Sequence, residues 1–521
     1  MGRRYGLRGP WVLRGLDLDL PTHTLIRIEG ANGAGKSTLL RLLAGLDAPT
    51  EGRVTGRPRT AYVPERFPAA LPFTAAGYLG HLGRVHGLPT AVAAARAEEW
   101  LERFGAADYA RTPLAELSKG TSQKIAVAQA LLAEPDLLVL DEAWTGLDTA
   151  ARDVLDRAVA ERVAGGATVV FVDHDPRRLE GRADAGYRLE GRTLTAVAVT
   201  PGDPGPAVRI EATGPASAEL PQGLPGAPVV ERDTGEPAAI RLTTTAAHSD
   251  SLLRALITAH PPWHITGLAQ VREPAHVPTA PAPDRAARPA RPARVPVRGT
   301  IALTRYQGAL LARSQSWLAP VLLYAAVLAV GVGAGQPLLD ALGYTAATLL
   351  PVAAWLVRLC VTQEPPAARA VLAAAVGPSR AHRAALLAGL GSALALGGTA
   401  VGTVLLISEP ADAGHTVAVP LPAASLAGLL GASCCALLGA AVGALCARPV
   451  LHRRGWSLVA TVLGALLVLV TDGSPAKAAV TGLVTGSLTG EVRVPVVPLA
   501  GAVVVAVAVA ALTSRLAALR E

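Results

Sequence analysis

The chain has 521 residues, a net charge of +8, and a composition that is 51% hydrophobic but only 17% charged. Together with a mean hydropathy of +0.37, this balance excludes a purely soluble protein and indicates membrane segments. Basic loops at the cytoplasmic face of a membrane protein explain the positive charge, so we expect no nucleic-acid partner. Only four of the 48 basic residues are Lys, which favours a bacterial source with a GC-rich genome.

Residues 1–200 are predicted to form a cytosolic α/β domain. Short apolar runs such as LIRI and DLLVLDE are typical of buried parallel strands. The stretch AVAAARAEEWLERFG has the period of an amphipathic helix. The start of the chain shows no apolar core of a signal peptide, so we expect this domain to remain in the cytosol.

Two further segments separate this domain from the membrane region. Residues 206–271 predict a small α+β appendage, in which VRIEA, IRLTTT and HITGLAQV are strands and SDSLLRALITAH is a helix. Residues 272–299 are rich in Pro and Arg, cannot bury a core, and predict an extended linker.

Residues 300–521 predict a transmembrane domain with about six helices. Six apolar stretches have close to the ~20 residues that span a hydrocarbon core. They lie at 317–334, 343–361, 384–407, 423–446, 455–471 and 494–512. The mixed segment 300–316 is predicted to be an amphipathic helix at the membrane interface.

The basic residues of the connecting loops predict the orientation of these spans. The loops on one side and the C-terminal tail carry eight Arg: Arg369, Arg380, Arg383, Arg448, Arg453, Arg454, Arg515 and Arg520. The opposite loops, 335–342, 408–422 and 472–493, carry only Lys477 and Arg493. The positive-inside rule therefore places the N-terminal domain and both termini in the cytoplasm of a multi-pass cell-membrane protein, with the lipid bilayer as a partner.

Small and sulfur-containing residues in the apolar stretches are less informative. Two G-x-x-x-G patterns, Gly398 to Gly402 and Gly439 to Gly443, fit either close helix contacts or chance in a chain with 53 Gly. All four Cys lie in apolar stretches without zinc spacing, so we expect packing residues and no disulfides.

A phosphate-binding loop lies at residues 30–38. Gly30, Gly35, Lys36 and Ser37 fit the pattern G-x-x-x-x-G-K-[ST], between a predicted strand and the helix STLLRLLAG. Lys36 is expected to reach the β- and γ-phosphates of ATP, and Ser37 to help hold Mg²⁺. The other predicted phosphate contacts are Gly30, Asn32, Gly33, Ala34, Gly35 and Thr38.

Two acidic residues end the predicted strand LLVLDE. Asp141 is placed to bind Mg²⁺ directly or through water, and Glu142 is placed to polarise the attacking water. The alternative is that the pair only caps a helix. Because a phosphate loop lies upstream, the catalytic interpretation is favoured.

The phosphate loop and the strand LLVLDE are two of five motifs that occur within residues 1–200. LSKGTSQK, at 117–124, resembles the signature sequence of the ABC ATPases, usually L-S-G-G-Q. WTGLD resembles the D-loop of that family, and FVDHD resembles its switch-histidine strand. The resemblance implies an α/β P-loop ATPase domain, and the apolar stretches predict an all-α polytopic membrane domain of about six helices after it.

The resemblance also assigns site residues. It implies that His174 contacts the γ-phosphate and acts in catalysis, that Asp148 lies in the D-loop, and that Tyr5 stacks on adenine, with Trp11 as a rival. Ser118 and Gly120 would face the ATP of another subunit from a helix N-terminus.

The sequence departs from the family pattern at three positions. Lys119 and Thr121 replace the usual Gly and Gln of the signature. Glu65 stands where the family has the Gln of the Q-loop. A Glu can still bind Mg²⁺, or it can be a plain surface-loop residue.

The whole chain resembles a half-transporter that needs a second copy of itself or a related half-transporter. Its membrane part resembles the ABC-2 type export permeases in length, with 362–383 as the expected coupling loop. Apart from Arg358, the spans lack clustered charges, so we expect export of an unknown apolar or amphipathic substrate. An ATP-driven mechanical regulator of an envelope partner is the alternative, although it usually needs a larger outer domain. A soluble ABC ATPase of DNA repair or translation conflicts with the membrane half.

Overall fold

The structure of the chain is a computed structural model. It describes residues 1–6, 9–56, 58–67, 70–175, 178–179, 181–197, 207–214, 228–232, 239–245, 249, 252–253, 256–257, 259, 263–271, 297–451 and 454–520. Residues 272–296, which make up most of the predicted linker, lie outside the described residues, as does Arg453.

A six-stranded sheet in the order β4-β5-β6-β3-β7-β8 forms the centre of the N-terminal domain. The strands from β4 to β7 are parallel, and β8 pairs antiparallel with β7. Their bounds are β3 Leu25–Gly30, β4 Thr60–Val63, β5 Leu137–Asp141, β6 Thr168–Val172, β7 Ala185–Glu190 and β8 Thr193–Val197. A separate pair, β1 Arg3–Arg4 and β2 Trp11–Leu13, precedes them.

Helices cover both faces of this sheet, which explains why its central strands are apolar throughout. Leu138 and Leu140 of β5 point into one core, and Val139 points into the other. The first core is covered by α2 to α5 and the second by α1. The helices are α1 Lys36–Leu43, α2 Ala75–Val85, α3 Thr90–Arg103, α4 Lys119–Leu131 and α5 Thr149–Ala164, with short 3-10 turns at Ala107–Tyr109 and Leu114–Glu116.

The segment that follows contains a four-stranded antiparallel sheet in the order β10-β11-β9-β12. Its strands are β9 Ala207–Thr213, β10 Val229–Arg232, β11 Ala239–Thr245 and β12 His264–Val271. Leu252 and Leu256, in the described part of the predicted helix, are buried with Trp263 against Ile210 and Leu242. The appendage therefore has an apolar core of its own.

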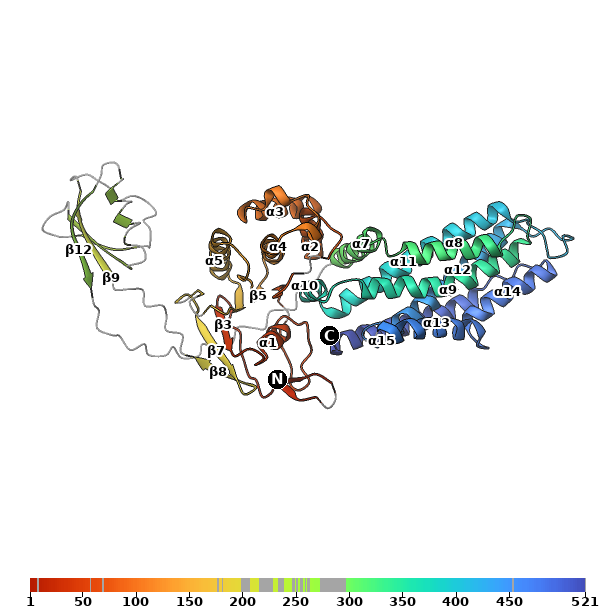
Figure 1. The fold of residues 1–521 in the computed structure, drawn as a ribbon, viewed down its shortest axis with the longest axis horizontal. Helices are drawn as coiled ribbons and strands as arrows, with labels where there is room; N and C mark the ends of the chain where they lie inside the picture. The colour runs from red at the N-terminus through yellow and green to blue at the C-terminus, as the bar shows by residue number, and fades with distance from the viewer. Residues whose placement is uncertain are drawn as a thin grey trace.

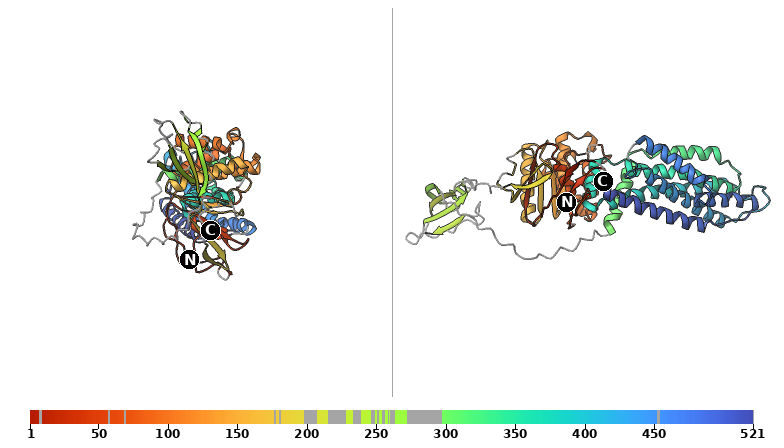
Figure 2. Two further views of the ribbon diagram at one scale, coloured as in Figure 1. Left: turned by 90° about the vertical axis from the view of Figure 1, so that its left-hand side faces the viewer. Right: turned by 90° about the horizontal axis from the view of Figure 1, so that it is seen from below.

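The rest of the chain is helical, and Figures 1 and 2 show its long helices running side by side away from the α/β domain. Among the described residues, four helices are long and apolar enough to cross a membrane, or six if each of two bent pairs counts as one span. The helices are α7 Val297–Arg313, α8 Leu318–Gly331, α9 Leu338–Thr362, α10 Pro366–Val376, α11 Pro378–Ile407, α12 Leu421–Leu445, α13 Arg454–Val470, α14 Pro475–Thr489 and α15 Val496–Arg520.

The prediction that 472–493 is a loop is wrong, because Pro475–Thr489 forms α14. Ser474 caps this helix, and Ala476, Ala479 and Leu483 are buried in the bundle. The axes of α13 and α14 meet at 52°. The thiol of Cys434, halfway along α12, lies 3.5 Å from the carbonyl oxygen of Pro475, so the break lies beside the middle of α12.

Two helices join the membrane region to the α/β domain. The predicted interfacial helix 300–316 corresponds to α7, whose buried Leu303, Tyr306 and Leu310 share one hydrophobic core with α2. The predicted coupling loop 362–383 contains α10, which packs against β4 and α2. Apolar burial therefore continues from one domain into the other.

The two G-x-x-x-G patterns behave differently. A Cβ added to Gly439 or Gly443 would lie 2.4 Å from a backbone carbonyl oxygen of α9, that of Leu350 or Ala354, respectively. A Cβ added to Gly398 or Gly402 would meet no described atom within 4 Å. The pattern at 439–443 is therefore a close contact between α9 and α12. The four Cys are free thiols, as expected.

Candidate nucleotide-binding site

The phosphate loop connects β3 to α1. Gly33 and Gly35 have φ angles of 80° and 105°, which glycine adopts without steric cost, so the loop can turn back before the helix starts. The ammonium group of Lys36 donates hydrogen bonds to the carbonyl oxygens of Gly30 (2.7 Å) and Ala31 (3.2 Å). The predicted phosphate contacts thus lie in one compact loop at the N-terminus of α1.

Asp141 ends β5 and is almost completely buried. Ser37 Oγ donates to its Oδ1 at 3.4 Å, and the Tyr62 hydroxyl donates to its Oδ2 at 3.1 Å. Burial raises the pKa of Asp141, and the hydrogen bonds from Ser37 and Tyr62 oppose this shift. The structure therefore brings together two of the three predicted magnesium ligands, Ser37 and Asp141.

Glu142 leaves the end of β5 with a φ angle of 53°, which is unusual for a residue with a side chain. Its backbone N–H donates to the carbonyl oxygen of Val172 in β6, which holds this turn. Its Oε1 lies 2.7 Å from Nε2 of His174. Burial raises the pKa of Glu142, while the interaction with His174 lowers it. The two predicted catalytic residues are therefore in direct contact.

Glu65 follows β4, and its half-exposed side chain lies 3.6 Å from the guanidinium of Arg66. After the main effect of burial, its charge contributes to the raised pKa values of Asp141 and Glu142. Glu65 is thus close enough to act on the site electrostatically, although its side chain remains accessible to solvent.

The predicted signature and D-loop residues form a second group. Ser118 caps α4 by accepting a hydrogen bond from the backbone N–H of Thr121 (3.1 Å), and Asp148 caps α5. Lys124 pairs with Asp148 at 2.6 Å, and this hydrogen bond lowers the pKa of the Asp148 carboxyl group. A Cβ on Gly120 would lie 3.0 Å from the Gly146 carbonyl oxygen. These contacts join α4 to the D-loop.

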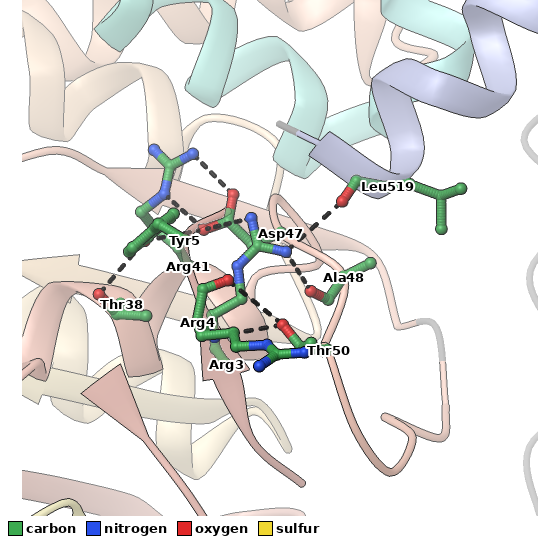
Figure 3. A network of polar contacts seen from close by, with 9 residues as sticks. All are labelled: Arg3, Arg4, Tyr5, Thr38, Arg41, Asp47, Ala48, Thr50 and Leu519. Atoms are coloured by element: carbon green, nitrogen blue, oxygen red, sulfur yellow. Dashed lines mark hydrogen bonds and ion pairs between the residues drawn. The ribbon is translucent and has the colours of Figure 1, made fainter. Parts of the chain in front are cut away.

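Tyr5 lies beside the phosphate-loop helix. Its hydroxyl group is 3.3 Å from both Thr38 Oγ1 and Asp47 Oδ2, and about half of the residue is exposed (Figure 3). Trp11 lies under the guanidinium groups of Arg4 and Arg14, at 5.0 and 5.2 Å from its ring centroid. Direct contact with Thr38 makes Tyr5 the better candidate for stacking on adenine.

The sequence analysis missed Tyr62, although the sequence held a signal for it. A Tyr in the middle of a buried strand needs a hydrogen-bond partner for its hydroxyl group. In the structure that partner is Asp141.

Comparisons with known proteins identify the N-terminal domain. The family model described as "ABC transporter" matches residues 13–145. The aliphatic sulfonates import ATP-binding protein SsuB of Mycobacterium avium is 38% identical over 204 residues, covering 37% of this chain and 80% of that relative. The chain belongs to the family of ABC transporter ATP-binding proteins. Its N-terminal region is an ABC ATP-binding domain, which is an ATPase.

Two further matches cover the same kind of ABC domain. An uncharacterised ABC transporter ATP-binding protein of Bacillus subtilis, YhaQ, is 37% identical over 175 residues. The alignment takes in 32% of this chain, which spans only 59% of the length of YhaQ. A solved structure of the ATP-binding subunit of an ABC transporter is 26% identical, with a TM-score of 0.35, and the match covers 37% of this chain and 87% of that one.

Proposed function

We propose that this ABC protein is an ATP-driven exporter that works as a pair, with a second copy or a related half-transporter. One observation carries the proposal: α10, between two membrane helices, packs on the strand that leads into the nucleotide site. Ala370, Ala373 and Ala374 of α10 share a hydrophobic cluster with Tyr62 of β4. Tyr62 in turn donates a hydrogen bond to Asp141. A movement at Asp141 can therefore reach α10 through a single side chain.

The site supports hydrolysis of ATP with Mg²⁺. The ion would be held by Ser37 and Asp141, whose oxygen atoms are the ligand type that Mg²⁺ prefers. Bound Mg²⁺ would neutralise charge on the phosphates. Glu142 would then polarise the attacking water, while His174 orients Glu142 and contacts the γ-phosphate.

The membrane helices favour an apolar or amphipathic cargo. Arg358, the charged residue within the predicted spans, donates from Nε to the hydroxyl group of Ser457 at 2.9 Å. It is thus engaged within the bundle near the ends of α9 and α13. The relative SsuB is named for sulfonate import, but the alignment covers 37% of this chain. We assign cargo selection to the membrane helices instead.

We further propose that the ATPase domain and both termini are cytoplasmic. Arg380 is exposed at the start of α11, and Ala413 is exposed in the loop between α11 and α12. In a background without the four native Cys, a cysteine at Ala413 should react with an impermeant maleimide in intact cells. A cysteine at Arg380 should react only after the cells are opened. The reverse pattern would overturn this orientation.

The coupling role of α10 gives a direct test of the transport proposal. Ala373 is buried against the ATPase domain, so Ala373→Trp should push α10 off β4. We expect substrate-stimulated ATPase activity to fall at least about tenfold, because small displacements of catalytic groups cause losses of this size or more. Ala367→Trp, at a partly exposed position on the same helix, should retain the stimulation.

The measurement uses cell-lipid and metabolite fractions sorted by polarity, added to protein in proteoliposomes. Apolar and amphipathic fractions should stimulate phosphate release by wild type. Stimulation by polar fractions alone would contradict the proposed cargo class, and equal stimulation of both Trp variants would contradict coupling through α10. Labelled cargo from the stimulating fraction should accumulate in inverted membrane vesicles given ATP, and ATP-driven loss from preloaded vesicles would contradict export.

A further inference from the structure

A buried charge network lies where the last helix meets the ATPase domain (Figure 3). The carboxylate of Asp47 accepts hydrogen bonds from Arg41 at 2.8 and 3.1 Å, and its side chain is fully buried. The guanidinium of Arg3 lies 3.9 Å from the same carboxylate, and only 6% of its side chain is exposed. Two guanidinium groups, that of the buried Arg3 and that of the partly exposed Arg41, therefore share one carboxylate.

The unbalanced charge of Arg3 faces backbone carbonyl groups. Its Nη1 donates to the carbonyl oxygen of Ala48 at 2.6 Å and approaches that of Leu519 at 3.5 Å. Leu519 is in the last turn of α15, where the free carbonyl groups carry the negative end of the helix dipole. A buried cation is costly unless it is paired, so the end of α15 stabilises Arg3 in this position.

The other side of the network reaches the nucleotide site. The Arg3 guanidinium lies 5.0 Å from the centroid of the Tyr5 ring, within cation–π range. The Tyr5 hydroxyl group contacts both Asp47 and Thr38, and Thr38 belongs to the first turn of the phosphate-loop helix. One guanidinium thus touches both the residue proposed to stack on adenine and the end of a membrane helix 516 residues away.

We propose that Arg3 is a positioning residue that ties the end of α15 to the adenine side of the nucleotide site. ATP that stacks on Tyr5 fixes the ring, and the ring fixes Arg3 against the carbonyl groups of α15. By linkage, docking of α15 strengthens ATP binding by the same factor. This contact would be a second connection between the nucleotide and the membrane helices. It runs through Arg3 of β1, whereas the first connection runs through β4 and α10.

The test uses the full-length protein without its four native Cys and with a nitroxide label at Leu519, whose side chain is largely exposed. A non-hydrolysable ATP analogue should lower the mobility of the label. In Arg3→Met the label should stay mobile with or without the analogue, and the Kd of the analogue should rise about fivefold, the lower end of typical coupling. Arg59→Met, which breaks a different Arg–Asp pair at 2.8 Å, should match wild type in both readouts.

The two readouts separate positioning from a local effect. If Arg3→Met weakens nucleotide binding but the label still responds to the analogue, Arg3 only supports Tyr5 and the inference is overturned. It is also overturned if neither quantity changes. Arg3→Lys keeps the charge but has fewer donors, so it should give intermediate values and serves if Arg3→Met does not fold. Both measurements need only nucleotide binding, so they do not depend on export or on the cargo.

Discussion

A Glu142→Gln chain is expected to bind ATP as wild type does and to hydrolyse it about 100- to 10,000-fold more slowly, the range for loss of a general base. The amide has nearly the shape of the carboxylate, so the turn at Glu142 and the contact with His174 can persist. Only the ability to polarise water is lost. Steady-state phosphate release and equilibrium binding of ATP measure the two effects. Normal steady-state hydrolysis by Glu142→Gln would remove Glu142 from its proposed role.

The matched variant Lys36→Ala should fail at the earlier step. It removes the ammonium group that lies over the phosphate loop, so ATP binding itself should weaken. Together the two variants separate nucleotide binding from water activation. A Lys36→Ala protein that binds ATP with wild-type affinity would contradict the role of Lys36 as the phosphate clamp.

Mixing two inactive chains is expected to restore part of the ATPase activity. If each ATP lies between Lys36 of one chain and Ser118–Gly120 of another, Lys36→Ala and Gly120→Asp damage opposite halves of a shared site. Gly120→Asp places a negative charge against the γ-phosphate, so each mutant homodimer has two broken sites. In the mixed dimer one site carries both lesions and the other carries none. Up to half of the wild-type rate should return if one site can turn over alone.

Differently tagged chains allow the mixed dimers to be purified before phosphate release is measured. Because a side chain at position 120 lies close to the Gly146 carbonyl oxygen, the Gly120→Asp protein must first show a wild-type unfolding temperature. Dimers of wild type with the double mutant have one lesion in each site and should be inactive. Activity in those dimers, combined with inactivity of the mixed single mutants, would mean that each chain completes its own site.

The fold class and the ABC ATP-binding domain were predictable from the sequence because local motifs fix their own surroundings. The pattern from Gly30 to Ser37 needs a strand before it and a helix after it, and the structure has β3 and α1 there. Asp141 follows the apolar run LLVL, whose residues are all buried and point alternately into two cores, as expected for a central strand. The catalytic and binding roles of these residues stay predictions.

The features that were not predictable depend on distant partners. The segment PAKAAVTGLVTGSLT has too few large apolar residues to indicate a buried helix, yet contact with α9 and α12 makes it one. A contact between the segment of α10 and the ATPase domain could be expected from the sequence. That α10 packs against β4 could not be predicted. Likewise, no local pattern connects Arg3 with Leu519, because their contact depends on how the whole membrane region folds back.

The close approach of α9 and α12 limits how the membrane region can change shape. Where Gly439 and Gly443 lie against the carbonyl groups of Leu350 and Ala354, no side chain is available to change rotamer and take up sliding. Such a close contact resists sliding of one helix along the other, so α9 and α12 should move as one rigid body. At the junction 471–474, α13 and α14 already meet at an angle of 52°, and a Cβ added to Gly473 would meet no described atom within 4 Å. Bending during a transport cycle should therefore concentrate at that junction, while α9 and α12 move together.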